Sequence, residues 1–189
     1  MPDAVIVSAA RTAIGTARKG SLADIDVFEL AKASISEALK RSSVPAEDVD
    51  DIIMGESLQG GGCVARYAAV DLGLTDIPGL AHNRHCASGM APIQTAAASI
   101  RGGMDRVVIA GGAESITTVM KKLPGPYAGV EPWLSPSHPA TPDAPTMDMS
   151  ITVGWNTAVK AGVSREEQDN WAFHSHMRAV AATASTSGS

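Results

Sequence analysis

Asn83-Arg-His-Cys-Ala-Ser-Gly-Met90 is the stretch on which the expected fold depends, because it separates a strand-like run from a helical pattern. Before it, residues 78–82 have the length and composition of a strand. After it, apolar residues recur at helical spacing, at Met90, Ile93, Ala97 and Ile100. The segment therefore predicts a strand, a tight turn and a helix in direct succession.

The same alternation of strand and helix extends outward along the chain. Further strands are expected at residues 4–8, 51–55 and 106–110. A helix is expected from Asp26, which with Glu29 has the spacing of a capping box, and another near residues 63–73. This alternation predicts an α/β fold, with a mixed, mainly parallel sheet covered by helices on both faces.

The composition is that of a globular protein and argues against several functional classes. The 189 residues are 44% hydrophobic and 19% charged, with a formal net charge of −5. An acidic balance argues against a nucleic-acid partner, and no apolar run approaches the roughly 20 residues of a membrane span. The two cysteines are too few for a disulfide scaffold. With no signal peptide visible, a cytoplasmic location is expected.

The composition changes near residue 120, which suggests a domain boundary there. Seven of the eleven prolines lie between Pro124 and Pro145. We therefore expect an α/β domain over residues 1–120 and a second region over 121–189. Long, proline-braced excursions of this kind often act as lids or binding segments.

The end of the second region has a helical signal of its own. Ser164 and Glu167 have the spacing of another capping box, and a helix of about 15 residues is expected after them. Small residues follow, so that a disordered tail is expected over residues 183–189.

Cys86 lies between a predicted strand and a predicted helix, where two interpretations are open. As a nucleophile, its thiolate would be stabilised by the helix dipole, and its backbone N–H would help to bind an oxyanion. As a structural residue, it would be a buried small hydrophobe, the usual fate of a free cysteine. No base can be identified from the local sequence: His82 and His85 are close to Cys86, but neighbouring residues on a strand point to opposite faces.

Three other candidate sites are weaker. Gly60-x-Gly62-x-x-Ala65 fits a short dinucleotide fingerprint, but the acidic residue expected about 20 positions later is missing, so a loop-shaping turn is favoured. No metal site is expected, because His82, His85 and Cys86 are irregularly spaced and have no second ligand pair nearby. Glu114 is expected to anchor loops by hydrogen bonds more readily than to act as a general base.

Five segments, in order along the chain, resemble the thiolase family. They are Ala4–Gly15, Gly61–Arg66, Asn83–Gly89, Gly111–Ser115, and Ser164–Asp169 together with Ser175–Arg178. Two condensing-enzyme relatives share the cysteine–helix arrangement, the decarboxylating ketoacyl synthases and the hydroxymethylglutaryl-CoA synthases. The segments at 111–115 and 164–178 favour the thiolases, and the resemblance implies the N-terminal half of a two-half α/β/α/β/α architecture.

The resemblance implies a specific chemistry. Cys86 would take an acyl group from acyl-CoA as a thioester, and acetyl-CoA would then attack it, or the reverse cleavage would occur. The substrates would be coenzyme A thioesters, with no permanently bound cofactor, in fatty acid metabolism. Met149 falls where the family places a methionine that lines the acyl pocket. Residues 121–150 would begin the loop domain, which acts as a lid over the pantetheine arm.

The sequence departs from the family in lacking a second half. In thiolases that half supplies a histidine base, an asparagine–water oxyanion site and a second cysteine, in Gly-His-Pro and Cys-x-Gly-Gly motifs that are absent from these 189 residues. Neither Cys63 nor His138 has the right context to replace them. We therefore expect the chain to be incomplete as a catalyst.

An isolated half would also expose an apolar face. We expect it to form a homo-oligomer, a dimer or a tetramer, or to associate with a missing C-terminal half. The alternative function is that of a non-catalytic thiolase-like fragment that acts only in assembly.

Overall fold

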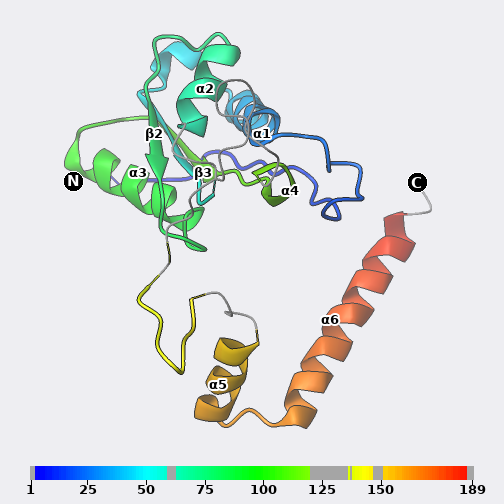
Figure 1. The fold of residues 1–189 in the computed structure, drawn as a ribbon. Coiled ribbons are helices and arrows are strands. Elements are labelled where there is room, and N and C mark those ends of the chain that lie inside the picture. The colour runs from blue at the N-terminus through cyan, green and yellow to red at the C-terminus, as the bar shows by residue number, and fades with distance from the viewer. Residues whose placement is uncertain (1–2, 59–62, 120–135, 137, 147–150, 187–189) are drawn as a thin grey trace, which may run out of the picture. The chain divides into compact units, whose positions relative to one another are not determined.

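The computed structural model describes residues 3–58, 63–119, 136, 138–146 and 151–186 (Figure 1). The chain divides into two compact units, Met1–Leu134 and Ser135–Ser189. The boundary between the units follows Leu134, whereas the composition suggested a boundary after residue 120.

A three-stranded sheet forms the centre of the first unit. The strands are β1 (Asp51–Gly55), β2 (Gly79–His82) and β3 (Val108–Gly112), in the order β2-β1-β3, and β1 is parallel to both neighbours. The predicted parallel pairing is thus confirmed, with the third of these strands starting two residues later than expected. In the register, Gly55 lies opposite both His82 and Gly112, so the carboxyl ends of the three strands are level.

Helices cover both faces of this sheet. On one face α1 (Val27–Ser42) and α2 (Val64–Asp71) contact each other and enclose Ile52 and Met54 in the main apolar cluster. Because side chains alternate along a strand, Ile53 and Gly55 face the other way. On that face α3 (Met90–Gly102) contacts β1 and β3 (Figure 1). The described part of this unit also contains two short elements, the 3₁₀ helix η1 (Ala46–Asp48) and α4 (Ile116–Val119).

The ends of α1 follow directly from the sequence. Asp26 is its N-cap, and one carboxylate oxygen accepts a hydrogen bond of 2.9 Å from the backbone N–H of Glu29. This confirms the predicted cap, which satisfies one of the first N–H groups of the helix. Inside the first unit, the rings of Phe28 on α1 and Tyr67 on α2 have centroids 4.0 Å apart.

The strand expected at residues 4–8 is wrong. This segment forms no ladder, and the side chains of Val5, Ile6 and Val7 are exposed. Residues 4–10 and the edge of the sheet at 107–112 both line a cavity of about 520 Å³. The sheet described by the structure thus consists of β1, β2 and β3, without a strand from this segment.

The described residues of the second unit form the helices α5 (Thr152–Ala161) and α6 (Arg165–Thr186). The predicted capping box is confirmed. The N–H of Ser164 donates to a carboxylate oxygen of Glu167 at 2.8 Å, and the N–H of Glu167 donates to the hydroxyl of Ser164 at 3.2 Å. The bond from the Ser164 backbone, followed by that from its hydroxyl, lowers the pKa of Glu167.

Helix α6 is 22 residues long and includes part of the expected tail. Residues 183–186 are helical, so the prediction of a disordered tail is wrong for them, and residues 187–189 lie outside the described part of the chain. The alanines in this stretch are strong helix formers, and the hydroxyl of Thr183 bonds back to the carbonyl of Ala179 at 3.0 Å.

Both helices of the second unit carry exposed aromatic side chains. Trp155 on α5 is 64% exposed and Trp171 on α6 is 77% exposed. Along the parts of the chain that the structure describes, no helix combines the length and the apolar character needed to cross a membrane.

Two adjacent carboxylates at the start of β1 experience opposite electrostatic environments. A carboxylate oxygen of Asp50 accepts hydrogen bonds from the backbone N–H groups of Arg106 at 2.6 Å and Val107 at 2.9 Å, which fixes the start of the β1–β3 pair. These backbone bonds, that of Val107 first, lower the pKa of Asp50. Burial instead raises the pKa of Asp51.

We predict that the variants Asp50→Asn and Asp51→Asn change the pH dependence of stability in opposite senses. A lowered pKa in the folded state stabilises the protein above the unfolded value of about 3.9, and this contribution is lost as the pH falls through the folded pKa. The advantage of the wild type over Asp50→Asn should therefore shrink in acid. For Asp51 the raised pKa makes the charged form unfavourable above pH about 3.9. The stability of the wild type relative to Asp51→Asn should therefore rise as the pH falls.

Urea unfolding midpoints of both variants and of the wild type, measured by circular dichroism across acid and neutral pH, test this prediction. Parallel pH profiles for all three proteins would show that neither carboxylate is coupled to folding.

Candidate active site

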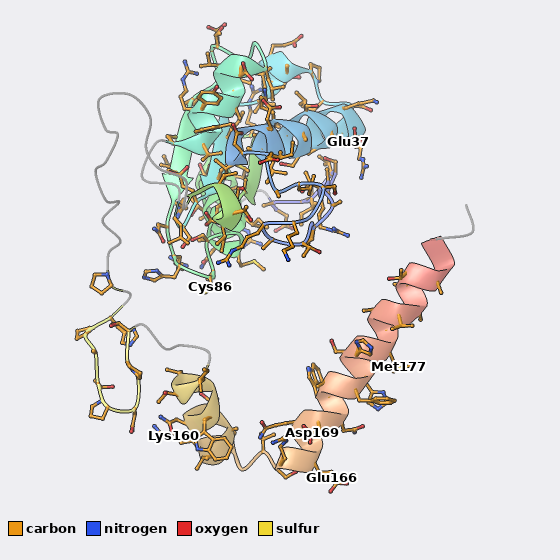
Figure 2. The ribbon with its side chains drawn as sticks, turned by 45° about the vertical axis from the view of Figure 1, so that its right-hand side comes forward. Glu37, Cys86, Lys160, Glu166, Asp169 and Met177 are labelled. Carbon is orange, nitrogen blue, oxygen red and sulfur yellow. The ribbon has the colours of Figure 1, made fainter. Side chains whose placement is uncertain are left out.

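Cys86 lies in the turn that connects β2 to α3, at the carboxyl end of the sheet. Its side chain is exposed at the surface of the first unit (Figure 2). The interpretation of Cys86 as a buried small hydrophobe is therefore wrong. Helix α3 begins at Met90, and the carbonyl of Ala87 already accepts a helical bond of 3.0 Å from the N–H of Ala91.

The residue before Cys86 has an uncommon backbone conformation. His85 has a φ of 47°, in the left-handed region that non-glycine residues seldom adopt. The side-chain oxygen of Asn83 accepts a hydrogen bond of 3.0 Å from the N–H of His85. On the other side, the hydroxyl of Ser88 donates to the carbonyl of His85 at 2.6 Å. These two side chains hold the turn in the shape that presents Cys86.

Ser88 links the turn at a second point as well. It is buried, and its hydroxyl also accepts a hydrogen bond of 2.9 Å from the N–H of Arg84. The same oxygen thus binds the backbone of two successive residues, Arg84 and His85. The buried Ser88 hydroxyl therefore stabilises the turn that carries the exposed Cys86.

The turn that contains Cys86 packs directly on the last residues of β1 and β3, which are glycines. A Cβ atom added to Gly55 would lie 1.9 Å from the carbonyl oxygen of Ser88, and one added to Gly112 would lie 3.2 Å from the Cα of Gly89. Glycine at these two positions therefore allows the Cys86 turn to approach the sheet.

Two glutamates bind the backbone of segments that follow the strands. Glu114, just after β3, accepts a hydrogen bond of 2.9 Å from the N–H of Ser57, which agrees with the anchoring role expected for it. Glu56 is only 5% exposed and accepts a bond of 2.6 Å from the N–H of Val64, the first residue of α2. Sequence reasoning missed Glu56, although its place between a strand and a glycine-rich segment was a usable signal.

The other candidate residues do not assemble with Cys86. Cys63 is half-buried and donates to the carbonyl of Gly79 at 3.4 Å. His82 contacts the hydroxyl of Thr95 at 3.2 Å, and His138 belongs to the second unit. Among the residues that the structure describes, the thiol of Cys86 forms no hydrogen bond with an imidazole, so the base remains unassigned.

Two further predictions concern cofactors and pockets. Within the described residues, no cluster of three or more histidine, cysteine or acidic side chains could hold a metal ion. Met149 and the glycines at 60–62 lie outside the described part of the chain.

Comparison with known proteins identifies the fold. Residues 4–187 match the family described as the thiolase N-terminal domain. The chain belongs to the thiolase family. The crystal structure of an acetyl-CoA acetyltransferase from Bacillus anthracis superposes with a TM-score of 0.77 at 30% identity, over 97% of this chain and 48% of that one. The predicted thiolase-like α/β fold is therefore confirmed for the N-terminal portion.

Curated relatives of this thiolase chain are considerably longer. It is 37% identical over 186 residues to the mitochondrial acetyl-CoA acetyltransferase A of Xenopus laevis, covering 95% of this chain and 44% of the relative. It is 36% identical over 195 residues to an acetyl-CoA acetyltransferase of Pseudomonas aeruginosa, covering 96% and 48%. The chain spans about half the length of the relatives it matches.

We predict that Gly55→Ala displaces the Cys86 turn and destabilises the first unit. The added methyl group meets a backbone carbonyl that no rotamer change can move, and such overpacking typically costs about 1–3 kcal/mol. Gly102→Ala is the matched control, because a Cβ there meets nothing within 4 Å. Urea unfolding of both variants checks the prediction, and a loss in Gly102→Ala as large as that in Gly55→Ala would contradict it.

Proposed function

We propose that this thiolase chain carries the acyl-accepting nucleophile of a transfer between acyl-CoA and acetyl-CoA, with Cys86 as that nucleophile. The observation that carries the proposal is the exposed thiol of Cys86, on a hydrogen-bonded turn between the end of β2 and the start of α3. The relatives in Xenopus laevis and Pseudomonas aeruginosa, both named acetyl-CoA acetyltransferases, support the same reaction class.

The first step would form a thioester on the protein. The thiolate of Cys86 attacks the acyl carbonyl, its electron pair forms the new S–C bond, and the carbonyl oxygen becomes an oxyanion. The backbone N–H of Cys86 would help to stabilise this charge. Collapse of the intermediate breaks the bond to coenzyme A, whose thiolate leaves and takes a proton.

The second step would consume the thioester. Removal of a proton from the methyl group of acetyl-CoA gives a carbon nucleophile, which attacks the acyl-cysteine carbonyl and releases the thiolate of Cys86. The product is a 3-ketoacyl-CoA, and thiolytic cleavage is the same sequence in reverse. Both substrates are coenzyme A thioesters, and the reaction needs no resident cofactor. Met149 would line the acyl pocket.

Groups from outside these 189 residues would supply the proton transfers. The thiol of Cys86 has no imidazole partner within the described structure, and the sequence holds no Gly-His-Pro or Cys-x-Gly-Gly motif. We propose a complementary second half as their source, within a homo-oligomer or a heteromeric assembly. The exposed apolar side chains of Val5, Ile6 and Val7 support such an association.

We predict that acetyl-CoA acetylates Cys86 of the 189-residue chain slowly and specifically. Peptide mapping by mass spectrometry should find the thioester on Cys86, and Cys86→Ser should lose it. Cys63→Ser is the matched control and should keep the label on Cys86. The thiol of Cys63 is half-buried and hydrogen-bonded to the carbonyl of Gly79, so it is not the expected acceptor. Acetylation of Cys63 alone would overturn the assignment, and no adduct on either cysteine would favour a fragment that acts only in assembly.

We also predict that the chain alone does not sustain thiolysis of acetoacetyl-CoA. General acid–base catalysis contributes typically about 10²–10⁴-fold, and this contribution would be missing. Addition of a separately expressed C-terminal half of a thiolase should raise turnover, provided that the two polypeptides associate. Steady-state release of acetyl-CoA, measured with and without the second polypeptide, tests this, and full turnover by the purified chain would refute it.

A further inference from the structure

We propose that Asn83 is a positioning residue for Cys86, and that it acts by tying the nucleophile turn to the ends of the other two strands. This inference rests on the function proposed for Cys86. It concerns a side chain that directly follows β2 and uses both of its polar groups within the fold.

The side-chain amide of Asn83 makes two hydrogen bonds, one to the segment after β1 and one within its own turn. Its side-chain N–H donates to the carbonyl of Ser57 at 3.1 Å, across the sheet end to the segment after β1. Its side-chain oxygen accepts from the N–H of His85 at 3.0 Å, within the turn. One side chain therefore couples the local shape of the turn to a neighbouring strand end.

Ser57 extends this coupling to the third strand. Its backbone N–H donates to the side chain of Glu114, which lies two residues after β3, at 2.9 Å. The residue is thus held by Glu114 through its N–H and by Asn83 through its carbonyl. A continuous set of hydrogen bonds links the segments that follow β3, β1 and β2, in that order, and ends at the residue before Cys86.

The conformation of His85 explains why this link matters for the nucleophile. A φ of 47° is unfavourable for a residue with a Cβ atom, so the surrounding contacts must hold it. The bond from His85 to Asn83 is one of these contacts, and Cys86 is the next residue. Without Asn83 the turn can relax toward ordinary backbone angles, and the thiol would move away from its place before α3.

Displacement of the nucleophile should affect acyl transfer more than simple thiol chemistry. Attack on a bound thioester needs alignment with an oxyanion donor, and a shift of about 1 Å can cost about 10²-fold. Alkylation of an exposed thiol by a small reagent needs no such alignment. Asn83 itself is exposed, so its truncation leaves the apolar core intact.

The test compares Asn83→Ala, Asn83→Asp and the double variant Asn83→Ala/His85→Gly with the wild type. For each protein, mass spectrometry follows acetylation of Cys86 by acetyl-CoA and alkylation of Cys86 by iodoacetamide, and NMR follows amide exchange at His85. Asn156→Ala is the control, because Asn156 is a half-buried asparagine of the second unit whose side chain also donates to a backbone carbonyl.

We expect Asn83→Ala to slow acetylation by about 10- to 100-fold, to change alkylation by less than about threefold and to speed exchange at His85. Asn83→Asp keeps the acceptor for His85 but loses the donor to Ser57, so its acetylation rate should lie between those of the wild type and Asn83→Ala. Glycine adopts positive φ readily, so the double variant should recover most of the lost rate. Asn156→Ala should match the wild type throughout.

Distinct results would overturn the inference and the function on which it rests. A wild type that is acetylated normally, together with an unchanged rate in Asn83→Ala, overturns the positioning role and leaves Cys86 as the nucleophile. Equal losses of acetylation and alkylation in Asn83→Ala, without rescue by His85→Gly, show a merely structural role. A wild type that is never acetylated at Cys86 overturns the proposed function and, with it, this role.

Discussion

The register of the three parallel strands is the constraint on which the other features of the site depend. Gly55 lies level with His82 and with Gly112, so three separate chain segments leave the sheet at the same edge. Each segment then has unpaired backbone groups that must find partners close to the others. A slip of one residue in either pairing would move these segments apart and would turn every side chain of the strand to the opposite face.

Glycines and glutamates allow these three segments to lie close together at the end of the sheet. Glycine at the ends of β1 and β3 leaves room for the turn before α3 to approach the sheet. The cost is entropic, because glycine loses more conformational freedom on folding than other residues. Glu56 and Glu114 then accept hydrogen bonds from backbone N–H groups of the crossing loops. The turn that exposes the Cys86 thiol thus packs on two glycines, beside segments that are held by carboxylate hydrogen bonds.

Local features were predictable from the sequence, and features that depend on distant partners were not. The Asp26 cap on the N–H of Glu29 and the reciprocal capping box of Ser164 and Glu167 were confirmed, because their chemistry is complete within one turn of helix. The apolar run at 4–8 looked like a strand, yet pairing needs a neighbour, and here a cavity lies beside it. The position of Cys86 in the fold could be predicted, but the hydrogen bond between Asn83 and Ser57 joins residues 26 positions apart and required the structure.

The distribution of tryptophan has a consequence for how this protein is observed in solution. The chain has three tryptophans, and Trp155 and Trp171 are largely exposed on the helices of the second unit. No tryptophan lies in the strands and helices described for the first unit, where the ring of Tyr67 packs on Phe28. Two of the three indoles therefore lie in the second unit, so emission spectra excited at the indole band will report largely on that unit and the solvent around it. The part that carries Cys86 will be followed better through tyrosine or through the amide signals of its sheet.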